Sequence, residues 1–405
     1  MTKQPSYRFA GYTESWVEKK LGEIVERITR KNKNLESDLP LTISAQYGLI
    51  DQETFFNKKV ASKDVSGYYL LKKGEFAYNK SYSSDYPWGA VKRLDNYEMG
   101  VLSTLYIVFR PNSIDSDFLA VYYDSPKWYK EVSMRAAEGA RNHGLLNISP
   151  QDFFDTELIF PVNQSEQIAI GSFFQDIDQL INLQQRKLEV LKEQKKTYLK
   201  LLFPAKGQTK PALRFAGFED DWKEVKLGEI LVERNEQISE SEEYQLMSFV
   251  QGKGVVPKSD RYDRSFLVKD DKKNYKKTEY GDFIYSSNNL DTGSIGFNKT
   301  GKALISPVYS IFYSKTRKES QFIAILSQRK EFINEMIKYR QGVVYGQFRI
   351  HESDFLNISI LAPESNEQEY LITFFQDLDK AIAKQEEKVN QLKESKQTLL
   401  RKMFI

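Results

Sequence analysis

Polar segments rich in basic and amide side chains contain the residues with the clearest chemical potential. Lys, Arg, Ser and Tyr bind phosphates, whereas Arg reads guanine edges and Asn and Gln read adenine edges. The same side chains also form ordinary solvated loops, so both interpretations remain open from these segments alone. The candidate DNA-binding residues are Asn79, Lys80, Ser81, Tyr82, Arg141, Asn142, His143, Lys253, Arg261, Arg264, Ser287, Asn288, Asn289, Arg340, Tyr345, Gln347 and Arg349.

Motifs for catalysis are weaker. Gly296–Ala303 comes within one residue of a phosphate-binding loop, but an alanine replaces the hydroxyl residue that binds magnesium, which favours a turn between strands. The pairs Asp176/Asp178 and Asp377/Asp379 lie two residues apart on predicted helices and point in different directions. A solvent-exposed face is therefore favoured over a metal site. We find no active-site motif, and we predict a chain without catalytic activity, a metal or a bound cofactor.

Composition sets the remaining bounds. The chain has 405 residues, 40% of them hydrophobic, which is enough for two to four domains with cores. A net charge of +3 suits a nucleic-acid binder only if the basic residues are unevenly distributed. No run approaches the ~20 apolar residues of a membrane span, and Met1–Gly11 lacks a signal-peptide core. The absence of cysteine fits a reducing compartment, so we expect a cytoplasmic protein.

An internal repeat organises the candidate residues. The segment Arg8–Ile24 matches Arg214–Ile230, and Phe173 and its neighbours match Phe374 and its neighbours. The chain is therefore two copies of one unit, a globular segment followed by a long helix. Mixed strand-like and helix-like runs predict an α+β fold, with helices at Asp115–Ala137 and Glu319–Lys338. The strand-like runs of copy one include Leu41–Ser44, Tyr68–Leu71, Glu75–Asn79, Gly89–Arg93 and Ser103–Arg110. The predicted boundaries are 1–161 for the first globular domain, 162–203 for the first helix, 204–213 for a linker, 214–363 for the second globular domain and 364–405 for the second helix.

Each long helix carries a heptad of apolar residues, interrupted by a Gln and then a Lys at the same seam positions in both copies. Packing of the two helices on each other within one chain is the simpler interpretation; separate dimerisation helices are the alternative. Asn163 with Glu166, and Ser365 with Gln368, are plausible caps. The predicted seam residues are Ile177, Ile181, Gln184, Leu188, Leu191, Lys195, Leu378, Ile382, Gln385, Val389, Leu392 and Lys396.

The two copies differ where the candidate DNA-binding residues lie. Asn79–Arg93 of copy one differs from Ser286–Lys299 of copy two, and Glu138–Ser149 differs from Gln341–Ser353. A shared scaffold with different loops is typical of two related binding modules for different targets. Neutral drift in loops would produce the same pattern.

The order and duplication of these motifs resemble the specificity (S) subunits of Type I restriction–modification enzymes. The resemblance rests on Trp16 with Leu21–Ile24, on Glu166–Gln167 with Phe173–Asp178, and on the matching residues of copy two: Trp222 with Leu227–Ile230, and Glu367–Gln368 with Phe374–Asp379. It covers nearly the whole chain. Each motif alone is weak, but the duplicated order is specific.

The resemblance implies that the globular parts are target recognition domains and that the helices form an antiparallel coiled coil. It implies binding to double-stranded DNA, two modification (M) subunits and restriction (R) subunits. S-adenosylmethionine would be bound by M, and ATP with Mg²⁺ by R, none of them by this chain. Because the loops differ, we expect an asymmetric two-part DNA site with an unread gap. The competing hypothesis is a non-enzymatic coiled-coil scaffold that holds protein partners.

Overall fold

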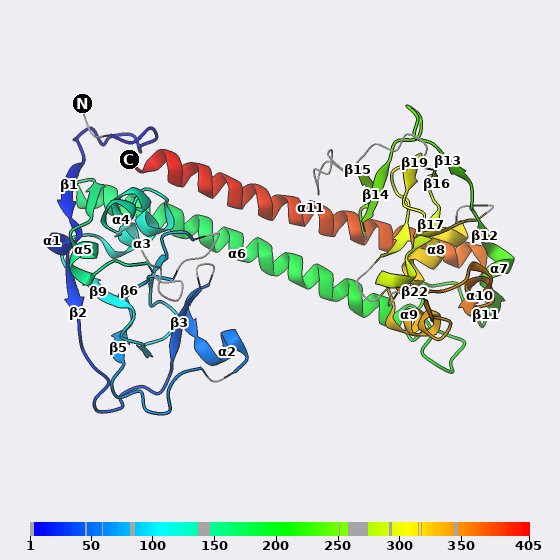
Figure 1. Cartoon of the computed structure of the whole chain (residues 1–405), viewed down its shortest axis with the longest axis horizontal. Helices are drawn as coiled ribbons and strands as arrows, with labels where there is room; N and C mark the ends of the chain where they lie inside the picture. Colours follow the sequence, from blue (N-terminus) through cyan, green and yellow to red (C-terminus); the bar gives the residue numbers. More distant parts are fainter. Residues whose placement is uncertain are drawn as a thin grey trace. The chain divides into compact units, whose positions relative to one another are not determined.

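The computed structural model describes residues 4–44, 47–58, 60–81, 86–136, 146–250, 252–257, 274–290, 294–314, 316, 318–343 and 347–405. The chain forms two compact units (Figure 1). The first unit comprises Met1–Arg186 with Glu387–Ile405, and the second comprises Lys187–Glu386. Each unit therefore contains one globular domain together with a part of each long helix.

The globular domain of the first unit alternates short strands with short helices before it enters the first long helix. Its elements are β1 (Val17–Lys20), α1 (Leu21–Ile24), β2 (Val25–Ile28), β3 (Leu41–Ser44), β4 (Gly48–Asp51), α2 (Gln52–Phe56), β5 (Tyr69–Lys72), β6 (Phe76–Asn79), β7 (Ala90–Arg93), β8 (Met99–Leu102), β9 (Ile107–Pro111), α3 (Ser116–Asp124), α4 (Tyr129–Arg135), α5 (Pro150–Phe154), β10 (Glu157–Phe160) and α6 (Gln164–Leu201).

The second unit repeats this order with small changes at the edges. Its elements are β11 (Lys223–Lys226), α7 (Leu227–Ile230), β12 (Val232–Glu233), β13 (Gln237–Ile238), β14 (Met247–Val250), β15 (Gly254–Pro257), β16 (Tyr275–Thr278), β17 (Phe283–Tyr285), η3 (Ser287–Asn289), β18 (Ile295–Phe297), β19 (Ala303–Ile305), β20 (Ser310–Tyr313), α8 (Lys318–Leu326), α9 (Lys330–Ile337), β21 (Gln341–Val343), β22 (Gln347–Arg349), α10 (Glu352–Leu356), β23 (Ser359–Ala362) and α11 (Ser365–Met403).

Equivalent antiparallel sheets form the centre of each unit. Four strands pair in the order β2-β9-β6-β7 in the first unit and β12-β20-β17-β18 in the second. The first strand of each copy pairs with the strand that closes its domain, β1 with β10 and β11 with β23. The predicted α+β class is therefore confirmed. The single helices predicted at Asp115–Ala137 and Glu319–Lys338 are each two helices instead; Pro126 lies between α3 and α4, where it cannot continue a helix.

Aromatic side chains build the same core in both units. Trp16 packs edge-on against Phe118 of α3 and Phe404, with ring centroids 6.2 and 6.3 Å apart. The second unit places its equivalents in the same way. There Trp222 packs against Phe322 of α8 at 6.0 Å and against Phe203 at 5.7 Å. The strand of each domain that follows Trp is thus anchored beneath the C-terminal end of a long helix.

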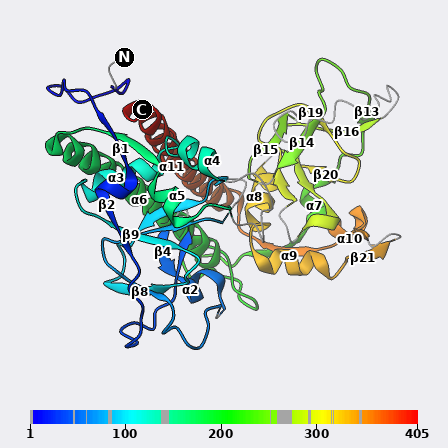
Figure 2. The same cartoon turned by 60° about the vertical axis from the view of Figure 1, so that its left-hand side comes forward.

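The two long helices run antiparallel beside each other within each unit (Figure 1, Figure 2). In the first unit, Lys396 near the end of α11 contacts Asp178 near the start of α6. In the second unit, Lys195 near the end of α6 contacts Asp379 near the start of α11. Intrachain pairing is therefore observed in place of the alternative, separate dimerisation helices. Each of the twelve predicted seam side chains is buried or half-buried.

The starts of the long helices depart from the predicted caps in two respects. Asn163 does cap α6, because its side-chain oxygen accepts a hydrogen bond from the Ser165 N–H at 2.9 Å. The second helix begins at Ser365 itself, one residue earlier than expected. Glu166 does not close a capping box; its carboxylate is occupied by a distant arginine, described below.

Candidate nucleic-acid interface

The described candidate residues of the first unit, Asn79, Lys80 and Ser81, lie where strand β6 ends. Asn79 accepts a hydrogen bond from the Ser81 N–H at 3.0 Å, which turns the chain out of the sheet. The Lys80 carbonyl accepts from the Leu146 N–H at 2.9 Å, and the Lys80 ammonium donates to the Ile148 carbonyl at 3.4 Å. The end of β6 is thus attached to the segment that leads into α5, and Ser81 is exposed beside it.

The second unit brings Ser287, Asn288 and Arg340 together at the equivalent place, after β17. The Ser287 hydroxyl accepts from the Ile350 N–H at 3.0 Å, and its carbonyl accepts from the Arg340 guanidinium at 2.8 and 3.1 Å. The Asn288 side-chain oxygen accepts from the Phe348 N–H. Ser287 is buried, so its role in this structure is to hold the segment; Asn288 is exposed.

A cation and an aromatic ring extend this cluster. The Arg340 guanidinium lies 4.7 Å from the centre of the Phe348 ring, and that ring is 45% exposed. Arg349 is exposed and contacts Glu352 at 3.5 Å. An exposed aromatic beside arginines is suited to stack on a base or to contact a phosphate. The sequence prediction did not include Phe348, because a single Phe in a polar segment resembles any core residue.

The ionisation state of Glu352, the carboxylate that contacts Arg349, is set by its surroundings. Burial by itself would raise the pKa of Glu352, but hydrogen bonds from its own backbone and from Ser310, together with the charges of Lys276 and Arg349, lower it. Glu352 is therefore ionised at neutral pH and holds the Arg349 side chain near the end of β22. A DNA phosphate would compete with this carboxylate for Arg349.

The remaining candidates are placed as follows. Lys253 is exposed in the turn between β14 and β15. The other predicted residues lie outside the described part of the chain: Tyr82, Arg141, Asn142, His143, Arg261, Arg264 and Tyr345. The side chains of Asn289 and Gln347 also lie outside it.

Both units place their variable residues at one structural position. In each, the residue after the shared G-x-F-x-Y-x segment is hydrogen-bonded to the segment that leads into the short helix α5 or α10. Lys80 occupies that position in the first unit and Ser287 in the second. The scaffold is thus equivalent while the side chains differ.

A repeated ion pair joins two of the duplicated motifs in each unit. Arg8 binds Glu166 at two points, at 2.6 and 2.7 Å, and Arg214 binds Glu367 in the same way at 2.8 and 2.7 Å. Both carboxylates are almost completely buried. Each pair attaches the start of a domain to the start of its own long helix, so the E-Q motif has a structural role.

The seam lysines also have partners that were not predicted. Lys195 Nζ lies 2.6 Å from an Asp379 oxygen, and Lys396 Nζ lies 2.7 and 2.8 Å from the two Asp178 oxygens. The expected solvent-exposed face is therefore correct for Asp176 and Asp377 but wrong for Asp178 and Asp379, which are half-buried. They could not be assigned from spacing alone, since their partners lie on the other helix.

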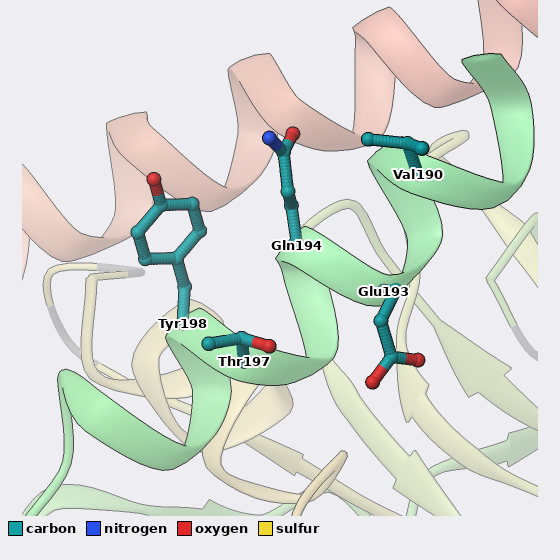
Figure 3. A pocket seen from close by; sticks show the side chains of 5 residues that line it. All are labelled: Val190, Glu193, Gln194, Thr197 and Tyr198. Atoms are coloured by element: carbon teal, nitrogen blue, oxygen red, sulfur yellow. The ribbon is translucent and has the colours of Figure 1, made fainter.

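A hollow of about 310 Å³ lies along α6 in the second unit. Figure 3 shows that Gln194 and Tyr198 project from the same side of the helix, whereas Glu193 points away from it. Its lining residues are Val190, Glu193, Gln194, Thr197 and Tyr198. Glu193 is the one carboxylate among these lining residues.

In the described part of the chain, no group of three or more His, Cys, Asp or Glu side chains is arranged to hold a metal ion. None of its helices combines the length and apolar character that crossing a membrane requires. The segment Gly296–Ala303 joins β18 to β19, which confirms the predicted turn between strands.

The fold and the paired loops define a duplicated protein with two similar α+β domains and two antiparallel long helices. No family model matches the sequence, and no curated protein matches it. The structure is similar to that of a Type I restriction–modification system S subunit from M. genitalium. The TM-score is 0.61 at 16% identity, covering 99% of this chain and 99% of that chain.

A second solved structure is also similar. It is a chain from work on complex assembly and conformational transition of the type I R-M system, with a TM-score of 0.54, 17% identity, and 96% and 97% of the two chains covered. At these identities the likeness is one of fold. The chain has the fold of a Type I restriction–modification S subunit along nearly its whole length, as the sequence resemblance indicated.

Proposed function

We propose that this chain is the DNA sequence-recognition subunit of a Type I restriction–modification complex. The observation that carries the proposal is the equivalent position of different polar residues in the two units. Lys80 with Ser81 occupies it in one unit, and Ser287 with Asn288 in the other. One scaffold with two sets of side chains reads two different half-sites, so the DNA target is asymmetric and two-part, with an unread gap.

The proposed division of labour follows from the same fold. This chain recognises double-stranded DNA and has no catalytic activity of its own. M subunits carry S-adenosylmethionine and methylate, and R subunits carry ATP and Mg²⁺ and cleave. We propose that the complex works in the cytoplasm.

The long helices are the proposed docking surface for the M subunits. In the first unit, Leu180 and Leu183 of α6 are 41% and 61% exposed; in the second, Val190 beside the hollow is 55% exposed. Large apolar side chains exposed on a helix that already has a partner are typical of a further protein contact. A helix of a partner fits such a stripe.

A methylation map tests the proposal. The chain is co-expressed with its cognate M subunit in a host without adenine methylation, and methylated adenines are then mapped by sequencing. A two-part motif with a fixed gap is the expected result. Exchange of residues 1–161 for those of another S subunit should change one half-site and leave the other intact. An absence of new methylation by a confirmed M–S complex would contradict the proposal and favour the protein scaffold.

A further inference from the structure

A network of ion pairs between four charged side chains links the C-terminal helix to the sheet of the first unit. Lys396 Nζ of α11 contacts both oxygens of Asp178 at 2.7 and 2.8 Å and an Asp124 oxygen at 3.2 Å. The other Asp124 oxygen contacts Lys92 Nζ at 2.6 Å. Asp124 ends α3, and Lys92 lies in β7. The ion-pair network thus connects α6 and α11 through α3 to the sheet.

Three of the four charged side chains are largely protected from water, whereas Asp178 is 45% exposed. The Lys396 side chain is 12% exposed, and those of Lys92 and Asp124 are 21% and 26% exposed. Burial by itself would raise the pKa of Asp124, but the ammonium groups of Lys92 and Lys396 lower it. Asp124 is therefore ionised and shared between two cations, so its loss would break the link between Lys396 and Lys92, while Lys396 would keep its contact with Asp178.

Strand β7 borders the candidate DNA-binding segment. It pairs with β6, where Ala77 faces Lys92, and the segment that carries Lys80 and Ser81 connects the two strands. That segment closes at Gly89, whose φ is +78° and where a Cβ would lie 2.1 Å from the Asn79 carbonyl oxygen. Such a tight closure transmits a shift of β7 directly to the segment.

The second unit has the equivalent helix-to-helix contact but does not use a carboxylate of α8 in it. Phe118 and Phe322 occupy equivalent places beside Trp16 and Trp222. Six residues after Phe118 is Asp124, and six residues after Phe322 is Gln328, which has no charge. Instead, Lys195 contacts one oxygen of Asp379, and the other oxygen lies 3.9 Å from Lys299 Nζ, two residues after β18. The second unit thus reaches the end of its sheet directly from α11.

We infer that Lys396 is a positioning residue for the first recognition domain. Through Asp124 and Lys92 it fixes β7, and with it the segment that reads the first half-site. This inference rests on the proposed function and deepens it. It assigns to one residue of the C-terminal helix an effect on one half-site only.

The test uses the M–S complex and oligonucleotides that carry a single mismatch in one half-site. Exchange of residues 1–161 first assigns the half-site that the first domain reads. Lys396→Met should then lower discrimination against mismatches in that half-site about tenfold, and leave discrimination in the other unchanged. Asp124→Gln should have the same effect, and the double variant should be no worse than either single variant.

Two controls separate positioning from helix pairing. Lys195→Met removes the equivalent helix-to-helix contact and should leave discrimination in the first half-site unchanged. Lys396→Arg keeps the positive charge and should retain most of the wild-type discrimination in that half-site. Amide hydrogen exchange of the complex gives an independent readout. Exchange in Ala90–Arg93 should rise in Lys396→Met but not in Lys195→Met.

Equal losses in both half-sites, or unchanged exchange in β7, would overturn the inference. If the wild-type complex yields no two-part motif, the proposed function fails and the inference with it. If the wild type yields the motif and Lys396→Met discriminates normally, only the inference fails.

Discussion

Arg8 and Glu166 lie 158 residues apart in the sequence and form an ion pair at two points, with Nε–Oε1 and Nη2–Oε2 distances of 2.6 and 2.7 Å. The Glu166 carboxylate is fully buried and also accepts a hydrogen bond from the Trp16 indole at 3.3 Å. The pair therefore joins the segment that precedes β1 to the first turn of α6, and the domain cannot separate from its helix without breaking a buried ion pair.

Glu166→Gln should destabilise the first unit by about 3 kcal/mol, because it leaves a largely buried arginine without its counter-ion. This value is at the low end for a broken buried pair, since the amide can still accept one hydrogen bond. Urea unfolding measures the change. The control is Glu98→Gln, which removes an exposed partner of Lys73 and should leave stability unchanged. Equal effects of both variants would contradict a structural role for Arg8 and Glu166.

Gly171→Ala should destabilise the chain even though alanine favours helices by about 1 kcal/mol. A Cβ at this position of α6 would lie 2.7 Å from the Asp117 Cβ and 2.9 Å from the Phe118 nitrogen. The backbone of α3 would have to move, and overpacking typically costs about 1–3 kcal/mol. Ser172→Ala, at the exposed neighbouring position, should be neutral in the same thermal unfolding experiment. If Gly171→Ala were more stable than the wild type, α3 would be able to move away from the added Cβ at little cost in free energy.

Charge reversal tests the pairing of the two helices in the second unit. Lys195→Asp and Asp379→Lys should each lower stability, because each places like charges across the helix pair where the wild type has a contact of 2.6 Å. The double exchange should recover a coupling free energy of about 0.5–3 kcal/mol, measured in a double-mutant cycle by urea unfolding. Strictly additive losses would mean that the two residues do not interact.

Arg349→Ala should weaken binding of the M–S complex to its DNA about tenfold and relax specificity in the second half-site. Lys253→Ala should weaken binding to all sequences alike and reduce the salt slope by about 1, as expected for a phosphate contact. Lys380→Ala on α11 is the control, because Lys380 is 76% exposed and pairs only locally with Asp377. Fluorescence anisotropy at several salt concentrations measures DNA binding of all three variants. A similar loss of affinity for Lys380→Ala would contradict the assignment of Arg349 and Lys253 as specific DNA contacts.

The stability of the folded chain should depend on pH through the ionisation of Asp124. The pKa of this carboxyl is lowered in the folded chain from its usual value of 3.8. A lowered pKa stabilises the fold at pH values above the unfolded pKa, and that stabilisation is lost as the pH falls through the folded pKa. The difference in unfolding temperature between wild type and Asp124→Asn should therefore be largest near neutral pH and shrink below about pH 4. A constant difference across this range would contradict the prediction.

Local sequence determined a large part of this protein. Strand Leu41–Ser44 was predicted with its observed limits, the alternating runs at Glu75–Asn79 and Gly89–Arg93 are β6 and β7 within one residue, and the duplicated order predicted two equivalent sheets. The heptads predicted which helix faces are buried. These features depend on the period of neighbouring side chains, which is written directly in the chain.

Only the tertiary structure decided which charges meet. Glu166 was expected to cap its own helix but binds Arg8, and Asp178 was expected in solvent but binds Lys396, 218 residues away. Contacts over such separations depend on how the chain returns to itself, and no local period encodes them. The same reason explains why the sequence indicated polar candidate segments, whereas the fold placed Arg340, Phe348 and Ser287 together after β17.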